Sequence, residues 1–521
     1  MHEPRLTPDL DLDALLALLD HVVVSAEPVT TTQRSPLDLA RMLPVPHTDA
    51  AAADRAFAEA RAAQPAWAAL PIGERVAIIR RFHDLVLEER EALCDVVQWE
   101  NGKARSHAMD EVFDVAITAQ YYSGLAPKLL GSKRRRGAFP LVTRTREVLH
   151  PKGVVGIISP WNYPLCIGIS DMIPALLAGN AVVWKPDLQT AVTAAMALDL
   201  LYAAGVPQHI VRMLNGEGGV VGPFITERAD KVMFTGSTAV GREVAATAAR
   251  RLVDVSLELG GKNSCIVMAD ADIDRAVDVA LRGAFANAGQ LCIGTERVLV
   301  HASIERAFTD AFVEAAQSMA LGPIIGWGSD MGPLVSPQQL ARTQAHVDEA
   351  VAKGAVVLTG GHARPDLGPL MYAPTILTGV TDDMAVCATE TFGPVCAVYT
   401  WADEAELLAR VNDTEYGLSA AIVSRDVRAA RRLATRVRAG SVNINEPYGS
   451  AWASVDAPMG GMGASGLGRR HGRQGLLKYT ESQTVSSQHV IALAPQGPLD
   501  DAAWARLVTV LLRVMKALHL R

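Results

Sequence analysis

Short runs of apolar, often β-branched residues alternate with alanine-rich, helix-like segments along most of the chain, and this alternation constrains the fold more than any other feature. One set of runs covers residues 154–159, 181–185, 231–235 and 264–268. A second set covers residues 296–301, 354–360, 395–401 and 419–425. Strands that alternate with helices form parallel sheets with helices on both faces. The sequence therefore predicts an α/β fold with two doubly wound α/β domains.

The chain opens with helical segments and also contains two extended stretches outside these sets. Apolar residues follow helical spacing from 49 to 97, with breaks expected near Pro65 and Pro71. The stretches 129–147 and 476–491 include strand-like runs, and isolated strands need partners for stability. We expect them to form a small β arm, which either joins copies of the chain or lies on the surface of one copy.

The tail, residues 499–521, has the pattern of an amphipathic helix. Apolar residues recur at helical spacing at Trp504, Leu507, Val508, Leu511, Met515 and Leu518, with Arg506, Arg513, Lys516 and Arg521 among them. A basic amphipathic helix either packs on a neighbouring subunit or lies on an anionic membrane surface. The sequence leaves both alternatives open.

Composition excludes several classes of partner. The 49 basic and 56 acidic residues give a net charge of −7 that is spread along the chain, so no basic patch indicates nucleic-acid binding. No run of about 18 apolar residues indicates a membrane span. The six cysteines lie far apart with no CxxC pair, which argues against a disulfide framework or a metal site. We expect a cytoplasmic protein whose partners are small molecules and copies of itself.

Two residues are candidates for covalent and acid–base chemistry. Cys292 ends the segment FANAGQLC. A helix N-terminus, a cation or a positively charged cofactor would make its thiolate a useful nucleophile by lowering the pKa, whereas a buried structural cysteine is the alternative. Glu258 ends an apolar run before two glycines. A raised pKa in a desolvated cleft would suit a general base, and a salt-bridged carboxylate is the alternative.

Two further segments are candidates for binding. The run 231–235 is followed by Gly236 and Ser237, where a helix begins, and the free N–H groups and hydroxyl there suit a phosphate. The pattern is not GxGxxG, and an ordinary strand–helix turn is the alternative. Asn162 follows another strand run, where its amide can donate to a developing oxyanion or simply form a turn.

These segments occur in the order and at the spacing of one family. From about residue 50 to about residue 490 the chain resembles the aldehyde dehydrogenase superfamily, and within it the enzymes named succinate-semialdehyde dehydrogenases. The matching motifs are PWNYP, KPD, FTGSTAVG, LELGGKN, FANAGQLC, ETFGPV and PMGGMGASGLGRRHG. The separation of Glu258 and Cys292, 292 − 258 = 34, equals the family's usual spacing between base and nucleophile.

The resemblance implies a division of the chain into parts. Residues 1–128 and 148–260 are expected to form the NAD(P)-binding domain and 261–461 the catalytic domain. Residues 129–147 and 476–491 are expected to form the arm of a homodimer or homotetramer, with 499–521 as an added amphipathic helix.

The resemblance also implies an activity, the NAD(P)-dependent oxidation of an aldehyde to a carboxylate. Cys292 is expected to attack the aldehyde carbon, while the Asn162 amide and the Cys292 backbone N–H hold the oxyanion. Glu258 then activates the water that hydrolyses the thioester. A thiol hydrolase would need no dinucleotide site and a CoA-acylating relative would lack the base, so both classes are disfavoured.

The cofactor contacts implied by the resemblance are Trp161, Lys185, Asp187, Leu188, Gly236, Ser237, Leu259, Glu390 and Phe392. Many NAD-preferring members have a glutamate three residues after the lysine, which repels a 2′-phosphate. Leu188 stands in that place, which favours NADP. NAD is the alternative, because Asp187 beside it can restore discrimination.

The substrate is less constrained. The best match by resemblance is succinate semialdehyde, but Ser170 and Ala286 replace arginines that hold its carboxylate in well-studied members. An uncharged aliphatic or aromatic aldehyde is therefore the alternative. Asp171 and Arg470 replace a lysine and a glutamate that form a proton-relay pair in many members. We expect the ion pair to persist with its polarity reversed.

Overall fold

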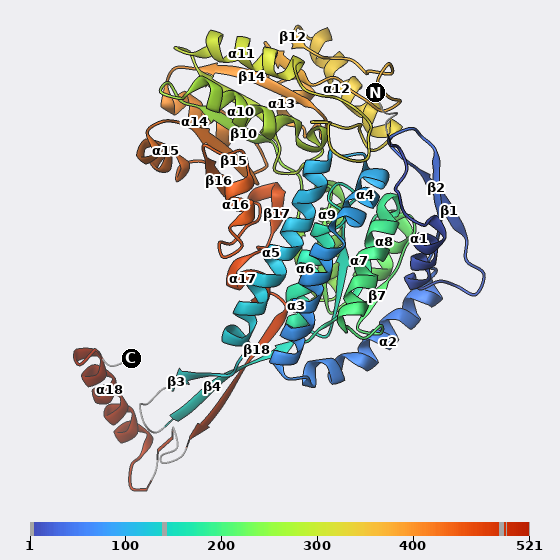
Figure 1. Cartoon of the computed structure of the whole chain (residues 1–521). Helices are drawn as coiled ribbons and strands as arrows, with labels where there is room; N and C mark the ends of the chain where they lie inside the picture. The colour runs from blue at the N-terminus through green and yellow to red at the C-terminus, as the bar shows by residue number, and fades with distance from the viewer. Residues whose placement is uncertain (1–4, 138–142, 489–493, 496, 520–521) are drawn as a thin grey trace.

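The computed structural model describes residues 5–137, 143–488, 494–495 and 497–519, which form two sheet-centred lobes and a projecting arm (Figure 1). The first lobe contains a six-stranded sheet in the order β17-β9-β8-β5-β6-β7, parallel except for β17. Its strands are β5 (Val154–Ile158), β6 (Ala181–Lys185), β7 (Val211–Met213), β8 (Lys231–Thr235), β9 (Asp254–Glu258) and β17 (Gly466–Leu467). The strands β6 and β8 are buried along their whole length, as expected for parallel strands covered on both faces.

The second lobe contains a seven-stranded sheet in the order β12-β13-β14-β11-β10-β15-β16, parallel except for β12. Its strands are β10 (Asn263–Val267), β11 (Thr295–His301), β12 (Val356–Thr359), β13 (Thr375–Thr378), β14 (Val395–Trp401), β15 (Ser419–Val423) and β16 (Ser441–Ile444). The predicted α/β class with two doubly wound sheets is confirmed, while the exact domain boundaries remain predictions.

Helices surround both sheets (Figure 1). Those of the first lobe are α1 (Leu12–Leu18), α2 (Ala50–Ala69), α3 (Ile72–Glu88), α4 (Arg90–Asn101), α5 (Arg105–Leu129), α6 (Cys166–Leu177), α7 (Ala191–Ala204), α8 (Gly218–Thr226), α9 (Thr238–Arg250) and α17 (Gly472–Leu477). Those of the second are α10 (Ile273–Phe285), α11 (Glu305–Gln317), α12 (Pro337–Ala352), α13 (Ala385–Ala388), α14 (Glu404–Asn412), α15 (Val427–Ala434) and α16 (Gly449–Ala453). Each lobe has its own large apolar core.

The structure differs from the sequence analysis at one proline and adds one hairpin. The helix α2 continues through Pro65, which was expected to break it. A proline inside a helix removes one N–H donor and crowds the carbonyl four residues earlier. Trp67 anchors the next turn against this cost by burying its ring and donating to the Leu176 carbonyl at 2.9 Å. The hairpin of β1 (Thr30–Arg34) and β2 (Arg41–Pro46) was not predicted, although its threonine run has strand propensity.

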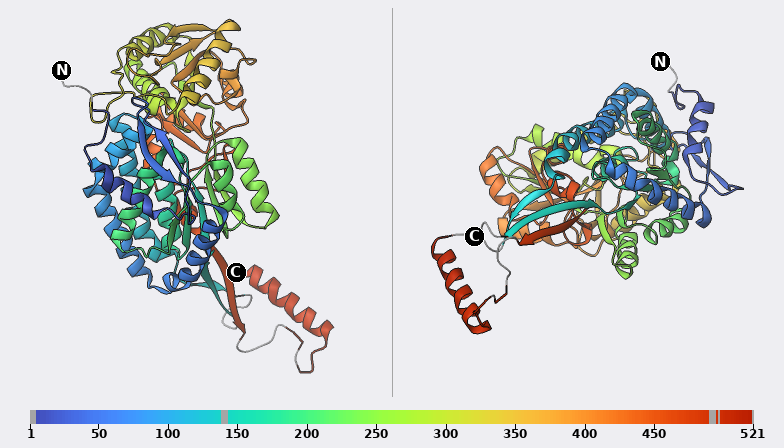
Figure 2. Two further views of the ribbon diagram at one scale, coloured as in Figure 1. Left: turned by 90° about the vertical axis from the view of Figure 1, so that its right-hand side faces the viewer. Right: turned by 90° about the horizontal axis from the view of Figure 1, so that it is seen from below.

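The predicted arm is present as a three-stranded antiparallel sheet, which projects from the body in all views (Figure 2). Its strands are β3 (Lys133–Arg136), β4 (Thr143–Pro151) and β18 (Thr480–Gln488), in the order β18-β4-β3. Residues 138–142 and 489–491 of the predicted arm segments lie outside the described residues. The strand β18 pairs with β4 on one side only, so within the described chain its other edge is open.

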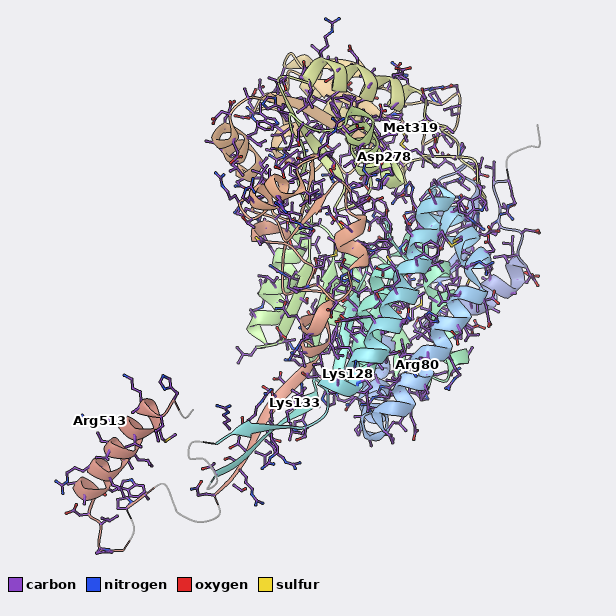
Figure 3. All side chains as sticks on the ribbon, turned by 60° about the vertical axis from the view of Figure 1, so that its left-hand side comes forward. Arg80, Lys128, Lys133, Asp278, Met319 and Arg513 are labelled. Atoms are coloured by element: carbon purple, nitrogen blue, oxygen red, sulfur yellow. The ribbon has the colours of Figure 1, made fainter. Side chains whose placement is uncertain are left out.

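The helix α18 (Asp501–Ala517) lies beyond the arm, with Arg513 away from the body (Figure 3). None of its residues is buried, and Leu507, Val510 and Leu512 are 50%, 57% and 54% exposed. The predicted basic residue Arg521 lies outside the described part of the chain. Among the helices of the described segments, none has both the length and the hydropathy needed to cross a bilayer.

Candidate active site

Cys292 is positioned by a strained loop between α10 and β11. In this loop Asn287 and Ala288 have φ values of 50° and 53°, a region that non-glycine residues rarely adopt. The Gln290 side chain ties the loop to its surroundings, since its Nε2 donates to the Asn287 carbonyl at 3.0 Å and its Oε1 accepts from the Val335 N–H at 2.9 Å. The thiol is therefore held in one place relative to both sheets.

Two cavities meet at Cys292. The inner cavity is lined by Pro160, Trp161, Asn162, Thr235, Gly236, Ser237, Glu258, Leu259, Gly260, Cys292, Gln339, Arg342, Glu390 and Phe392. The aromatic pocket is lined by Asp110, Asp114, Tyr163, Cys166, Ile167, Leu291, Cys292, Ile293, Tyr448, Trp452, Met459, Arg470 and His471. Of the described residues, only Cys292 lines both, so a molecule in either cavity can reach the sulfur.

The inner cavity continues into a longer outer groove at the carboxyl ends of β5, β6 and β8. Pro160, Trp161, Thr235, Gly236 and Ser237 line both spaces. The groove has a volume of about 580 Å³. Open α/β sheets bind ligands at the carboxyl ends of their strands. The inner cavity and the outer groove together form a continuous channel that ends at Cys292.

The Asn162 side chain faces the inner cavity from the turn after β5. Its Nδ2 donates to the Gln290 carbonyl at 3.1 Å, which orients the amide and uses one of its two N–H groups. Lys103 fixes the same turn, because its buried ammonium donates to the Asn162 carbonyl at 2.7 Å and to Glu111 at 2.6 Å. The Cys292 N–H donates no hydrogen bond within the described chain. Both residues line the inner cavity, so two donors are available there.

Glu258, at the carboxyl end of β9, is 8% exposed and lines the inner cavity with Cys292. Its Oε1 is buried without a hydrogen-bond partner in the described residues. Burial raises the pKa of Glu258 from 4.5 to about 7, although the positive charges of Arg470 and Lys478 oppose the shift. A carboxyl with this pKa exchanges protons near neutral pH, as a general base requires.

The thiol itself is not activated by the protein alone. Burial, together with the carboxylates of Glu390 and Glu258, raises the pKa of Cys292 from 9.0 to about 12, against the opposing charge of Arg470. A positive charge brought into the inner cavity by a ligand would lower it. The thiolate therefore forms more readily when a positively charged ligand occupies the channel.

Eight of the nine predicted cofactor residues line the channel. Trp161, Gly236, Ser237, Leu259, Glu390 and Phe392 line the inner cavity, and Lys185 and Asp187 line the outer groove. Leu188 is the exception, since it lines neither space and its side chain is buried in the core. It therefore contributes no polar group to the groove.

The walls of the channel combine dipoles, charge and aromatic surface. Ser237 caps α9, whose first turn offers free N–H groups to the channel. Lys185 is 3% exposed and donates to the Pro186 carbonyl at 3.0 Å, and burial lowers its pKa. The Trp161 and Phe392 rings meet edge to face with centroids 5.7 Å apart.

The predicted pair of Asp171 and Arg470 is close in the structure, with 3.5 Å between the carboxylate and the guanidinium. Lys478 and the Tyr479 hydroxyl also donate to Asp171, each at 3.1 Å. Burial alone would raise the pKa of Asp171, but the charges of Arg470 and Lys478 outweigh it and the pKa is lowered. Lys478, the second cation, was not expected from the sequence.

The aromatic pocket brings together residues that the sequence analysis did not single out. Asp110 and Asp114 come from α5, Tyr163 from the turn after Asn162, and Tyr448 and Trp452 from the segment after β16. A pair of acids four residues apart on a largely buried helix was the only sequence signal. Ser170 and Ala286, which replace expected arginines, add no cation to the pocket.

Comparisons with known proteins agree with this geometry. The aldehyde dehydrogenase family model matches residues 23–485, so the chain belongs to the aldehyde dehydrogenase family of NAD(P)-dependent oxidoreductases. A relative from Mycolicibacterium smegmatis, provisionally named succinate-semialdehyde dehydrogenase NADP(+), is 49% identical over 89% of this chain and 90% of its own.

Two solved structures have the same fold. An NADP-dependent enzyme of E. coli is 33% identical with a TM-score of 0.85, and the match covers 88% of this chain and 95% of that one. Betaine aldehyde dehydrogenase from Staphylococcus aureus, in complex with NAD+, is 32% identical with a TM-score of 0.85, over 92% and 97% of the two chains.

Proposed function

We propose that this protein oxidises an aldehyde to a carboxylate with NADP, through a thioester on Cys292. The observation that carries the proposal is the position of Cys292 as the one described residue lining both the inner cavity and the aromatic pocket. A substrate carbonyl and a redox cofactor can then approach the same sulfur from two sides.

The channel residues fit a dinucleotide. Gly218, Gly219 and Gly222 line the outer groove, and a Cβ at any of them would meet nothing within 4 Å, which leaves room for a bulky ligand. The first turn of α9 at Ser237 suits a pyrophosphate, and Lys185 and Glu390 suit ribose hydroxyls. The bound cofactor would supply a hydride acceptor and a positive charge near the thiol.

The chain's own residues then carry out the remaining chemistry. The Cys292 sulfur forms a bond to the aldehyde carbon and releases its proton, and the oxyanion accepts hydrogen bonds from Asn162 Nδ2 and the Cys292 N–H. A donor in such a position contributes about 10²–10³ in rate. After oxidation to the thioester, Glu258 removes a proton from water, the water oxygen bonds to the carbonyl carbon, and the carbon–sulfur bond breaks to release the acid.

NADP is proposed over NAD because no carboxylate stands at position 188, and because the relative's name specifies NADP(+). Asp187, the residue before Leu188, lines the groove, and its carboxylate accepts a hydrogen bond from the Gln189 N–H at 2.9 Å. This hydrogen bond holds the Asp187 carboxylate within the turn after β6.

Two substrate classes remain candidates. Succinate semialdehyde is brought to this chain by the relative's name. An uncharged aldehyde is favoured by the pocket, where the one cation in the lining, Arg470, is already paired with Asp171.

The activity is tested by following absorbance at 340 nm with succinate semialdehyde, hexanal and benzaldehyde, each with NADP and with NAD. We expect reduction of the cofactor with at least one aldehyde, and a higher kcat/KM for NADP than for NAD. Absence of cofactor reduction with every aldehyde contradicts the proposed function. A tenfold preference for NAD contradicts only the cofactor assignment.

We also propose a homodimer or homotetramer, in the reducing cytoplasm that six free cysteines suit. The open edge of β18 and the exposed apolar face of α18 are surfaces that a second copy can cover. In sedimentation velocity we expect the full chain to be oligomeric and a chain ending at Gly497 to dissociate more readily. A monomeric full chain contradicts the assembly, and binding of α18 to anionic vesicles instead identifies a membrane partner.

A further inference from the structure

The aromatic pocket contains a carboxylate without a counter-ion. Asp110 and Asp114 lie one turn apart on α5, and both line the pocket. Asp114 accepts a hydrogen bond from the Ser170 hydroxyl. Asp110 is half-buried and has neither a hydrogen bond nor an ion pair to any residue of the described segments.

The cations near Asp110 are already used by other carboxylates. Lys103 is paired with Glu111 at 2.6 Å, and Arg282 is paired with Asp278 and Glu446, each at 2.9 Å. Burial raises the pKa of Asp110 to about 6, against the opposing charge of Lys103. At pH 7 the carboxylate is mostly ionised, so the pocket carries a negative charge that the chain leaves unbalanced.

Arg470 does not neutralise the charge of Asp110. Its guanidinium is directed to Asp171 at 3.5 Å and donates to the Ile167 carbonyl at 3.3 Å. It also lies near the carboxylates of Asp114 and Glu258, which together with Asp171 raise its pKa despite burial. The positive charge of Arg470 is therefore shared among three acids, none of which is Asp110.

Part of the remaining lining suits a cation. Tyr448 and Trp452 line the same pocket, and aromatic faces attract positive charge. The ring of Tyr163 lines it too, but one face of that ring already holds the Lys103 ammonium, 3.6 Å from the centroid. His471 is 5% exposed, and its Nδ1 is buried with no partner in the described chain. Burial and the neighbouring Arg470 lower the pKa of His471 to about 3, so its ring is neutral and carries one acceptor nitrogen.

We propose that the aromatic pocket selects aldehydes whose far end carries a positive charge, with Asp110 as the residue that sets this specificity. The inference rests on the proposed function and names its substrate class. A semialdehyde of a dicarboxylic acid carries the opposite charge at its far end. Its tail carboxylate would be repelled by Asp110.

The test uses an isosteric pair of substrates, 4-(trimethylammonio)butanal and 5,5-dimethylhexanal, which differ in a nitrogen for a carbon. We expect kcat/KM with NADP to be higher for the cationic aldehyde by about tenfold or more. In Asp110→Asn we expect this ratio to fall towards one. Because the ratio is measured within each variant, a general loss of activity cancels.

The control is Asp310→Asn, which removes a charge from an exposed position of α11 and should keep the wild-type ratio. A wild-type ratio of one or less overturns the inference without any variant. An unchanged ratio in Asp110→Asn assigns the selection elsewhere and also overturns it. If no aldehyde of any charge is oxidised, the proposed function itself fails, whereas oxidation of only neutral or anionic aldehydes defeats this inference alone.

Discussion

Replacement of Cys292 by alanine is expected to reduce aldehyde oxidation by on the order of 10⁴-fold or more. The reason is that no other described thiol lines the inner cavity, so no sulfur remains to bond to the aldehyde carbon beside the cofactor. Cofactor binding should persist, because the outer groove is formed by other residues. Steady-state rates at 340 nm and quenching of tryptophan fluorescence by NADP measure the two properties separately.

Cys387→Ala is the matched control for this variant. Cys387 is also only partly buried, but it lies on α13 in the second lobe and lines neither the inner cavity nor the aromatic pocket. It should retain wild-type turnover. Substantial turnover in Cys292→Ala would remove the covalent mechanism and leave direct hydride transfer from a hydrated aldehyde to be considered.

The parallel strands and the motifs at their carboxyl ends were predictable because both depend on local sequence. Buried parallel strands such as β6 and β8 are short continuous apolar runs, and each turn that follows has to supply special residues such as Asn162 or Ser237. Glu258 and Cys292 were recognised by their spacing within a known family. Their proximity in space follows from the meeting of the two sheets.

The aromatic pocket was not predictable in the same way. Its walls come from α5 and the turn after β5, in the first third of the sequence, and from the segment around α16, in the last third. Asp171 and Arg470 were paired from a family pattern, but Lys478 joined them only through the position of α17 at the base of the arm. Leu188 was expected at the cofactor, and its burial reflects the packing of the turn after β6, which the sequence does not encode locally.

The charge of Asp110 acts together with the residues at positions 170 and 286. Positions 170 and 286, where the resemblance implies carboxylate-binding arginines, are Ser170 and Ala286, and Asp110 on α5 carries a carboxylate. The absence of a cation at these two positions and the uncompensated charge of Asp110 act in the same direction, since both weaken binding of an anionic tail. A hydroxyl at Ser170 that hydrogen-bonds Asp114 stabilises the acidic side of the pocket further.

Replacement of Glu258 by glutamine is expected to stop the reaction after the oxidation step. The amide has nearly the same shape but cannot accept the proton of the attacking water, so the thioester on Cys292 should accumulate. We expect a burst of about one NADPH per active site, followed by a steady rate lower by about 10²–10⁴-fold. Mass spectrometry of the quenched protein should find the acyl group on Cys292, and hydroxylamine should restore turnover by attacking the thioester directly.

The pH dependence of the wild-type protein tests the same residue. Because burial raises the pKa of Glu258 from 4.5 to about 7, the carboxyl is protonated and inactive as a base below that pH. The deacylation rate should therefore rise with pH through about 7 and level off above 8, and this rise should vanish in Glu258→Gln. A wild-type rate with its midpoint near 4.5 would mean that Glu258 is solvated during turnover. A glutamine variant with undiminished steady-state turnover would show that another group activates the water.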